Sequence, residues 1–111
     1  MAKDLPSQGV QFLLGHAKED WVGFFAITST LQKFYPSATS AIARRQAAVQ
    51  LISDAWDHGL RPGELTSADP IIFVPWALSK QQSLEKVKQV LDKFGDVPRS
   101  DSESIWFDLV E

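Results

Sequence analysis

The stretch DPIIFVP, residues 69–75, carries the strongest strand signal in the chain. Its four central residues are β-branched or aromatic, and a proline stands on each side of them. Such side chains favour extended backbone, whereas Pro75 limits the length of the strand or confines it to the edge of a sheet. We therefore predict a short strand at 71–74 that needs a partner elsewhere in the chain.

A second strand is predicted near the C-terminus, where residues 105–110 read IWFDLV. Aromatic and β-branched residues again dominate the segment. Successive side chains of a strand point to opposite faces, so Asp108 is expected to face away from the side on which Phe107 lies. We predict that this strand pairs with 71–74.

Three helices are predicted around these strands. Apolar residues recur three and four positions apart over about 20–34, 40–58 and 79–94, which places most of them on one face of each helix. Capping and helix-breaking residues stand at both ends of each segment. The residues expected to bound the three helices are Asp20 and Pro36, Ser37–Ser40 and Gly59, and Ser79 and Gly95.

The first nineteen residues show no comparable pattern, and Gly9 and Gly15 weaken any helix there. We interpret 1–19 as an N-terminal lead-in and 20–111 as a single α+β domain. The predicted order is helix–helix–strand–helix–strand, with three main helices and a small antiparallel sheet. This order also allows a winged-helix-like arrangement.

The composition is typical of one globular domain, with 111 residues of which 44% are hydrophobic and 23% are charged. The absence of cysteine excludes disulfides and thiolate metal sites. No segment approaches the roughly 20 apolar residues that span a bilayer. The first residues do not resemble a secretory signal. We therefore expect a cytoplasmic protein without a membrane partner.

The sequence lacks the motifs of common enzyme classes, including a glycine-rich phosphate loop, Gly-x-Ser-x-Gly and His-Glu-x-x-His. His16 lies four residues before Asp20, and His58 lies four residues after Asp54. Such pairs more often form local ion pairs than metal or catalytic sites. We expect no metal, no cofactor, no small-molecule substrate and no catalysis. A small enzyme that uses His58 with Asp54 is the alternative.

The net charge of −3 is unevenly distributed. Residues 96–111 hold five acidic residues and one basic residue, whereas residues 1–95 hold nine acidic and ten basic residues. An acidic segment of this kind attracts a basic partner protein. The adjacent Arg44 and Arg45 point to an alternative, a winged-helix-like DNA-binding transcriptional regulator, although the acidic balance disfavours nucleic acid as a partner.

Five short motifs occur in a characteristic order along residues 20–111. They are Gly59-Leu60, Gly63-Glu64-Leu65, Phe73-Val74-Pro75-Trp76, Leu78-Ser79 and Ile105-Trp106-Phe107. In this layout the chain resembles small bacterial proteins, among them the immunity proteins of contact-dependent growth inhibition systems, which neutralise a toxin domain delivered by a neighbouring cell.

The resemblance implies a cytosolic, non-catalytic protein that binds its cognate toxin and blocks the active site of that toxin. Many such toxins are basic nucleases, often acting on transfer RNA, so no direct contact of this chain with nucleic acid is expected. Trp76 is interpreted as a plug at a strand–helix corner or, alternatively, as an exposed anchor for the partner. The acidic residues predicted to contact the toxin are Asp96, Asp101, Glu103 and Asp108, followed by Glu64 and Asp69.

Overall fold

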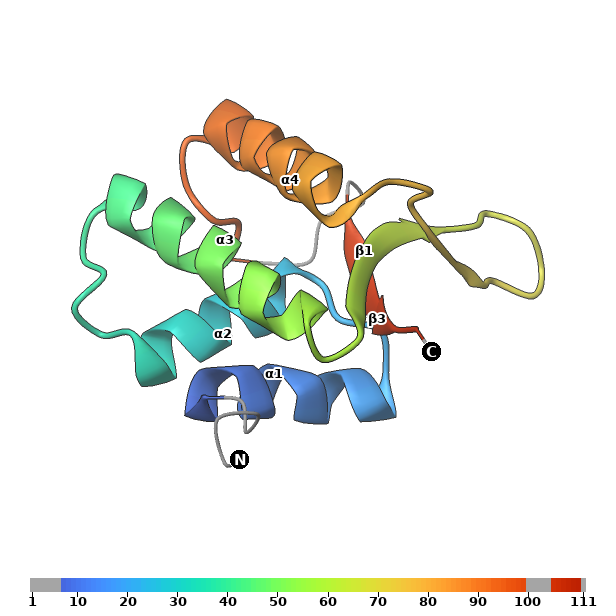
Figure 1. Cartoon of the computed structure of the whole chain (residues 1–111), viewed down its shortest axis with the longest axis horizontal. Helices are drawn as coiled ribbons and strands as arrows, with labels where there is room; N and C mark the ends of the chain where they lie inside the picture. The colour runs from blue at the N-terminus through green and yellow to red at the C-terminus, as the bar shows by residue number, and fades with distance from the viewer. Residues whose placement is uncertain (1–6, 100–104, 111) are drawn as a thin grey trace.

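The structure is a computed structural model that describes residues 7–99 and 105–110. In this part of the chain four helices accompany a three-stranded antiparallel sheet (Figure 1). The predicted α+β class with a small antiparallel sheet is therefore confirmed. The elements, in order, are α1 (Gln8–Glu19), α2 (Phe24–Phe34), α3 (Ala41–Trp56), β1 (Leu60–Leu65), β2 (Phe73–Pro75), α4 (Lys80–Phe94) and β3 (Trp106–Leu109).

The central strand of the sheet is β1, and the strand order is β2-β1-β3. β2 pairs with β1 so that Gly63 lies opposite Pro75, and β3 pairs with β1 so that Gly63 lies opposite Trp106. The predicted pairing of 71–74 with 105–110 is thus wrong, because both segments pair with β1 instead. Residues 71 and 72 precede β2, which begins at Phe73.

A Pro-Gly pair such as Pro62-Gly63 is a common turn signal, yet residues 60–65 form the middle strand of the sheet. The Pro62 carbonyl oxygen accepts a hydrogen bond from the Trp76 backbone N–H at 3.0 Å, just past the end of β2. The N–H that Pro62 lacks affects only one position of the pairing between β1 and β2, and this position lies where that pairing ends. Proline is therefore tolerated in this central strand.

Helix α1 corrects the interpretation of 1–19 as a lead-in, since residues 8–19 form a regular helix of the core. The Ser7 side chain accepts a hydrogen bond from the Val10 N–H and caps the helix. Gly9 lies against the Tyr35 ring, where an added Cβ would stand 3.0 Å from Cε1. Close packing against α2 therefore explains a glycine that weakens the helix signal. Residues 1–6 lie outside the described part.

Helix α2 begins later than predicted, at Phe24, with Gly23 as its N-cap. Asp20 is the C-cap of α1 and not the start of α2. Between the two helices, Val22 exchanges two backbone hydrogen bonds with Phe107, at 2.8 and 2.7 Å. The segment that leads into α2 is extended because it forms a short β-bridge with the edge of β3 that faces away from β1.

The other helix ends follow the predicted signals closely. The Ser40 side chain caps α3, and Ser79 forms a capping box with Gln82 at the start of α4. Gly59 (φ 102°) and Gly95 (φ 83°) follow α3 and α4 in the left-handed conformation that glycine adopts without strain. Helix α3 ends at Trp56, two residues before the predicted end.

The core lies between the helices and one face of the sheet. Phe24 and Phe107 meet edge to face near its centre, with ring centroids 6.1 Å apart. Among the described residues, no helix is both long and apolar enough to cross a membrane. The largest fully buried side chains are Phe24, Phe107, Leu13, Ile27, Leu51, Ile52, Leu60, Leu91, Ile105, Val10, Val22 and Val87.

Candidate protein-binding site

Residues 62–78, which we call the β1–β2 arm, extend beyond the helices on one side of the molecule (Figure 1). The connection between the two strands is closed by two hydrogen bonds. The Thr66 N–H donates to the Ile72 carbonyl oxygen at 2.9 Å, and the Ile72 N–H donates to Thr66 Oγ1 at 3.0 Å. The backbone from 66 to 72 therefore continues the antiparallel pairing past the ends of β1 and β2.

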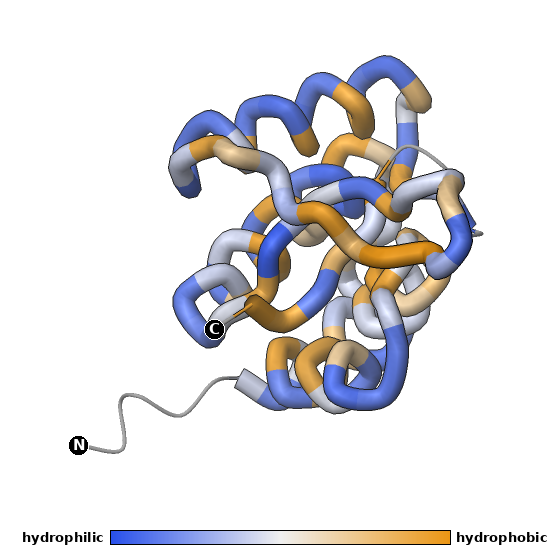
Figure 2. The backbone as a smooth tube through the Cα atoms, turned by 90° about the vertical axis from the view of Figure 1, so that its right-hand side faces the viewer, coloured by the Kyte–Doolittle hydropathy of each residue, from blue (hydrophilic) through white to orange (hydrophobic). Residues whose placement is uncertain are grey.

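Four of the eight exposed large hydrophobic side chains in the described residues lie on this arm. Ile71 and Ile72 are each 52% exposed, Val74 is 46% exposed and Leu78 is 36% exposed. Figure 2, which looks at this side of the molecule, shows an unbroken run of hydrophobic residues along the backbone there. Apolar surface gathered in this way on a small protein is typical of an interaction site, whereas scattered exposed residues are ordinary.

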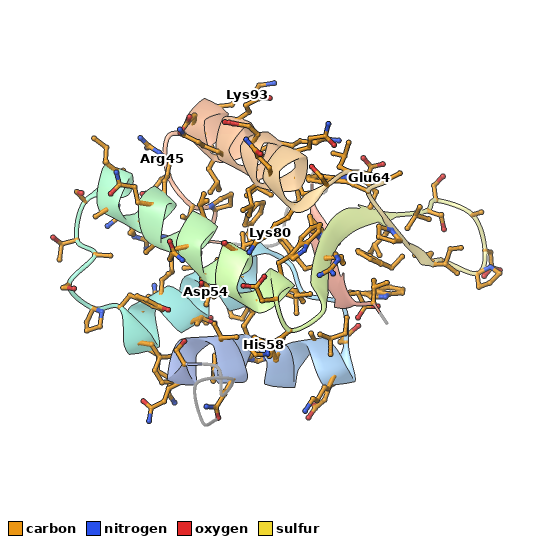
Figure 3. All side chains as sticks on the ribbon, in the orientation of Figure 1. Arg45, Asp54, His58, Glu64, Lys80 and Lys93 are labelled. Atoms are coloured by element: carbon orange, nitrogen blue, oxygen red, sulfur yellow. The ribbon has the colours of Figure 1, made fainter. Side chains whose placement is uncertain are left out.

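The charges on the arm are exclusively acidic. Glu64 and Asp69 are exposed, and the sequence contains no Lys or Arg from residue 62 to residue 79. Figure 3 shows Glu64 on the arm, apart from the labelled Arg45 and Lys93, whereas the labelled Lys80 begins the helix that follows the arm. Two of the predicted contact residues therefore lie on the apolar arm, where they favour a partner with a basic surface.

Two basic residues that border the arm, Arg61 and Lys80, contact other side chains of the protein. The Arg61 guanidinium lies 3.9 Å from the centre of the Trp56 ring and donates to the Trp56 carbonyl oxygen. Lys80 Nζ lies 2.8 Å from the carboxylate of Asp57, which keeps the pKa of Asp57 below its ordinary value. These contacts occupy the charges of Arg61 and Lys80, whereas a third basic residue, Lys86, lies over the ring of Trp76 on the arm itself.

Asp96 has a structural contact that the sequence did not reveal. The Arg44 Nε and NH2 atoms lie 3.0 and 2.7 Å from its two carboxylate oxygens, a bidentate pair between α3 and the segment after α4. The hydrogen bonds from Arg44, and a weaker one from the Val97 N–H, hold the pKa of Asp96 below its ordinary value. Asp96 therefore joins two parts of the fold and is separate from the arm.

Asp108, another predicted contact, lies outside the arm. Asp108 is half-buried on β3, opposite Arg61, and accepts a hydrogen bond from the Leu109 N–H at 2.8 Å. Phe107 is buried, so the two side chains differ in exposure as the alternation of a strand predicts. Asp101 and Glu103 lie outside the described residues.

Trp76 lies at the corner between β2 and α4, half-buried against the core. Lys86 Nζ lies 4.1 Å from the centre of its ring, a cation–π distance. Its indole N–H is buried without a hydrogen-bond partner among the described residues. This location matches the core-plug interpretation more closely than that of an exposed anchor.

The residues of the two alternative sites, the DNA-binding arginines and the proposed catalytic pair, contact other groups of the protein. Arg45, beside Arg44 on α3, donates to the Gly95 carbonyl oxygen and lies 3.4 Å from Asp92. Asp54, which the enzyme alternative pairs with His58, accepts a hydrogen bond from the Gln50 side-chain amide at 2.9 Å. Figure 3 labels both Asp54 and His58. Within the described ranges, no three His, Asp or Glu side chains gather as metal ligands would.

Comparison with known proteins adds no relationship: no family model, no curated protein and no solved structure matches this chain.

The exposed isoleucines of the arm are the functional candidates that sequence reasoning missed. The sequence pattern at Ile71 and Ile72 predicts a strand but not its exposure. The signal was the run IIFV, in which apolar residues occupy both faces of a strand that Pro75 already indicated as an edge. An edge strand with two apolar faces leaves apolar surface uncovered unless another element packs on it.

Asp96→Asn should lower the free energy of unfolding at neutral pH by about 1 kcal/mol, because it removes an exposed but bidentate ion pair. The folded-state pKa of Asp96 is depressed, so the ion pair stabilises the fold above the unfolded-state pKa of about 3.9. That contribution is lost as the pH falls through the lower folded-state value. Urea titrations over this acidic range should show the difference between variant and parent shrink as the pH falls.

Asp92→Asn is the matched control for this measurement, since Asp92 has a single 3.4 Å contact with Arg45 and is exposed. Its stability should stay within about 0.5 kcal/mol of the parent. A loss at Asp96 that is independent of pH would contradict an electrostatic origin.

Proposed function

We propose that this chain is a protein-binding immunity protein that neutralises a toxin domain by covering the active site of that toxin. The single observation that carries the proposal is the β1–β2 arm, where exposed apolar side chains occur together with acidic residues and no basic ones. Protein interfaces combine a desolvated apolar centre with charges that complement the partner. The arm offers both features to a basic protein.

A nuclease is the kind of toxin that fits this surface best. An enzyme that cleaves transfer RNA binds phosphates through Lys and Arg side chains, so its active-site groove is positively charged. Glu64 and Asp69 would pair with such cations while the isoleucines bury apolar surface beside them. The proposal includes a cytoplasmic location, because transfer RNA is found there, and assigns neither catalysis nor a cofactor to this chain.

The DNA-binding alternative has weaker support. Phosphate contacts require Lys or Arg side chains that are free to approach the duplex. Arg44 and Arg45 instead contact Asp96, Asp92 and the Gly95 carbonyl oxygen. We therefore favour a protein partner.

The test is co-expression with a candidate toxin domain whose gene neighbours the gene of this protein. The parent chain should restore growth of cells that make the toxin and should co-purify with it. Ile72→Lys places a positive charge on the arm and should weaken binding by about thirtyfold or more, the effect of losing an interface hot spot. Affinity measured by calorimetry and growth measured in the same strains give the two readouts.

Ile42→Lys is the matched control, because Ile42 is 61% exposed on α3, away from the arm. It should protect cells and bind toxin as the parent does. Failure of the parent to protect or to co-purify would refute the immunity function. Equal losses in both variants would refute the arm as its site.

A further inference from the structure

The outer edge of β2 is open. β2 is the last strand of the sheet in the order β2-β1-β3, and within the described part of the chain no strand lies along its other side. A strand edge of this kind offers unpaired backbone N–H and C=O groups to another chain. It is located on the arm, between the exposed apolar side chains.

The hydrogen-bond pattern identifies which groups point outward. Two bonds, from the Trp76 N–H to the Pro62 oxygen and from the Thr66 N–H to the Ile72 oxygen, place residues 72, 74 and 76 in the bonded positions toward β1. Bonded positions alternate in an antiparallel pair. The N–H and C=O groups of Ile71 and Phe73, and the C=O of Pro75, therefore face away from β1.

Short length and an edge proline are devices that block edge-to-edge pairing. β2 has both, but its proline acts at one end only. Pro75 removes a donor at the C-terminal end, whereas Ile71 and Phe73 keep complete outward-facing backbone groups. An added strand would thus pair beside residues 71–73 and stop at Pro75.

The side chains around this edge define what kind of strand would pair there. Ile71 and Ile72 alternate to opposite faces of the extended segment, and both are half exposed, so apolar contacts are available on both faces. The charges of the arm, Glu64 and Asp69, are negative and favour basic residues in the added strand. A second copy of this chain fits less well, because pairing two arms brings like charges together.

We infer that the outer edge of β2 binds an extended segment of a partner protein in which basic and apolar residues alternate, by adding it as a fourth strand of the sheet. Backbone bonds to Ile71 and Phe73 supply the pairing, and the flanking side chains select the sequence. This inference rests on the proposed function, because it names how the arm holds its protein partner.

Amide exchange measured by nuclear magnetic resonance tests strand addition directly. The probe is a short synthetic peptide that alternates Arg and Val and is blocked at both ends, added in excess to isotope-labelled full-length protein. Exchange of the Ile71 and Phe73 amides should slow by about tenfold, the effect of one added hydrogen bond. The Val74 amide, which already faces β1, should change little.

Two controls separate pairing from general association. A peptide that alternates Glu and Val should bind more weakly, and Ile72→Lys should weaken binding of the Arg–Val peptide whereas Ile42→Lys should not. The inference is overturned if the Arg–Val peptide does not bind, or binds without slowing exchange at Ile71 and Phe73. It is also overturned if their exchange slows with protein concentration alone, since a second copy would then occupy the edge.

The outcome is independent of the co-expression test, because the peptide assay contains no toxin. Slowed exchange together with failure to protect cells would refute only the immunity function. Protection of cells without slowed exchange at Ile71 and Phe73 in the toxin complex would refute only strand addition.

Discussion

Phe107→Ala should lower the free energy of unfolding by about 3–5 kcal/mol, the cost of emptying a large buried aromatic site. Phe107 has no exposed surface, and its ring meets Phe24 edge to face at an interplanar angle of 78°. Its backbone also exchanges two hydrogen bonds with Val22. The side chain therefore lies where β3, the start of α2 and the core meet. Urea denaturation followed by tryptophan fluorescence measures the change.

Phe94→Ala is the control, because Phe94 at the end of α4 is 53% exposed. It should cost less than about 1 kcal/mol, since much of its surface already contacts solvent. If the Phe107→Ala chain does not fold, Phe107→Leu keeps most of the volume and should cost about 1 kcal/mol. Equal losses at positions 94 and 107 would contradict the central role of Phe107.

The elements with local end signals were predicted best. The end signals at Ser40, Ser79 and Gly95 depend on hydrogen bonds or φ angles within a few residues, so a short window of sequence contains the whole cause. The α+β class followed from the same local patterns. Two ends were displaced: the end of α3 by two residues, and the start of α2 by four, because Asp20 caps the end of α1.

The missed elements depend on contacts between distant residues. Gly9 weakened the helix signal of α1, but its role is to let α1 approach Tyr35. Pro62 suggested a turn, but it stands where the ladder with β2 ends. In each case a tertiary contact decided the conformation that local propensity disfavoured. A sequence without its fold does not show such contacts.

The site was predicted in part for the same reason. The distribution of acidic residues along the chain does not show that Asp96 pairs with Arg44, 52 positions earlier. Glu64 and Asp69 were predicted as contacts only after the C-terminal acidic residues, yet they lie on the apolar arm. Charge becomes a binding feature only when its position relative to exposed apolar surface is known.

Gly63→Ala should destabilise the sheet by about 3 kcal/mol, at the upper end of the cost of overpacking. Gly63 is buried in β1 beneath the Phe73 ring. An added Cβ would collide with the Val74 carbonyl oxygen and would lie 2.7 Å from both Phe73 Cζ and Pro75 Cα. Two of these three atoms belong to the backbone of the paired segment, so they can retreat only if β2 separates from β1. Urea denaturation measures the loss.

Gly15→Ala provides the opposite result from the same chemical change. Gly15 is exposed in α1, and no atom within 4 Å would meet its Cβ, so the variant should gain about 0.5–1 kcal/mol from helix propensity. Loss of β1–β2 pairing should also abolish binding of the Arg–Val peptide in Gly63→Ala, while Gly15→Ala keeps it. If Gly63→Ala were as stable as the parent, the close packing of Phe73 on β1 would be contradicted. If it lost stability and still bound the peptide, binding would not require the paired arm.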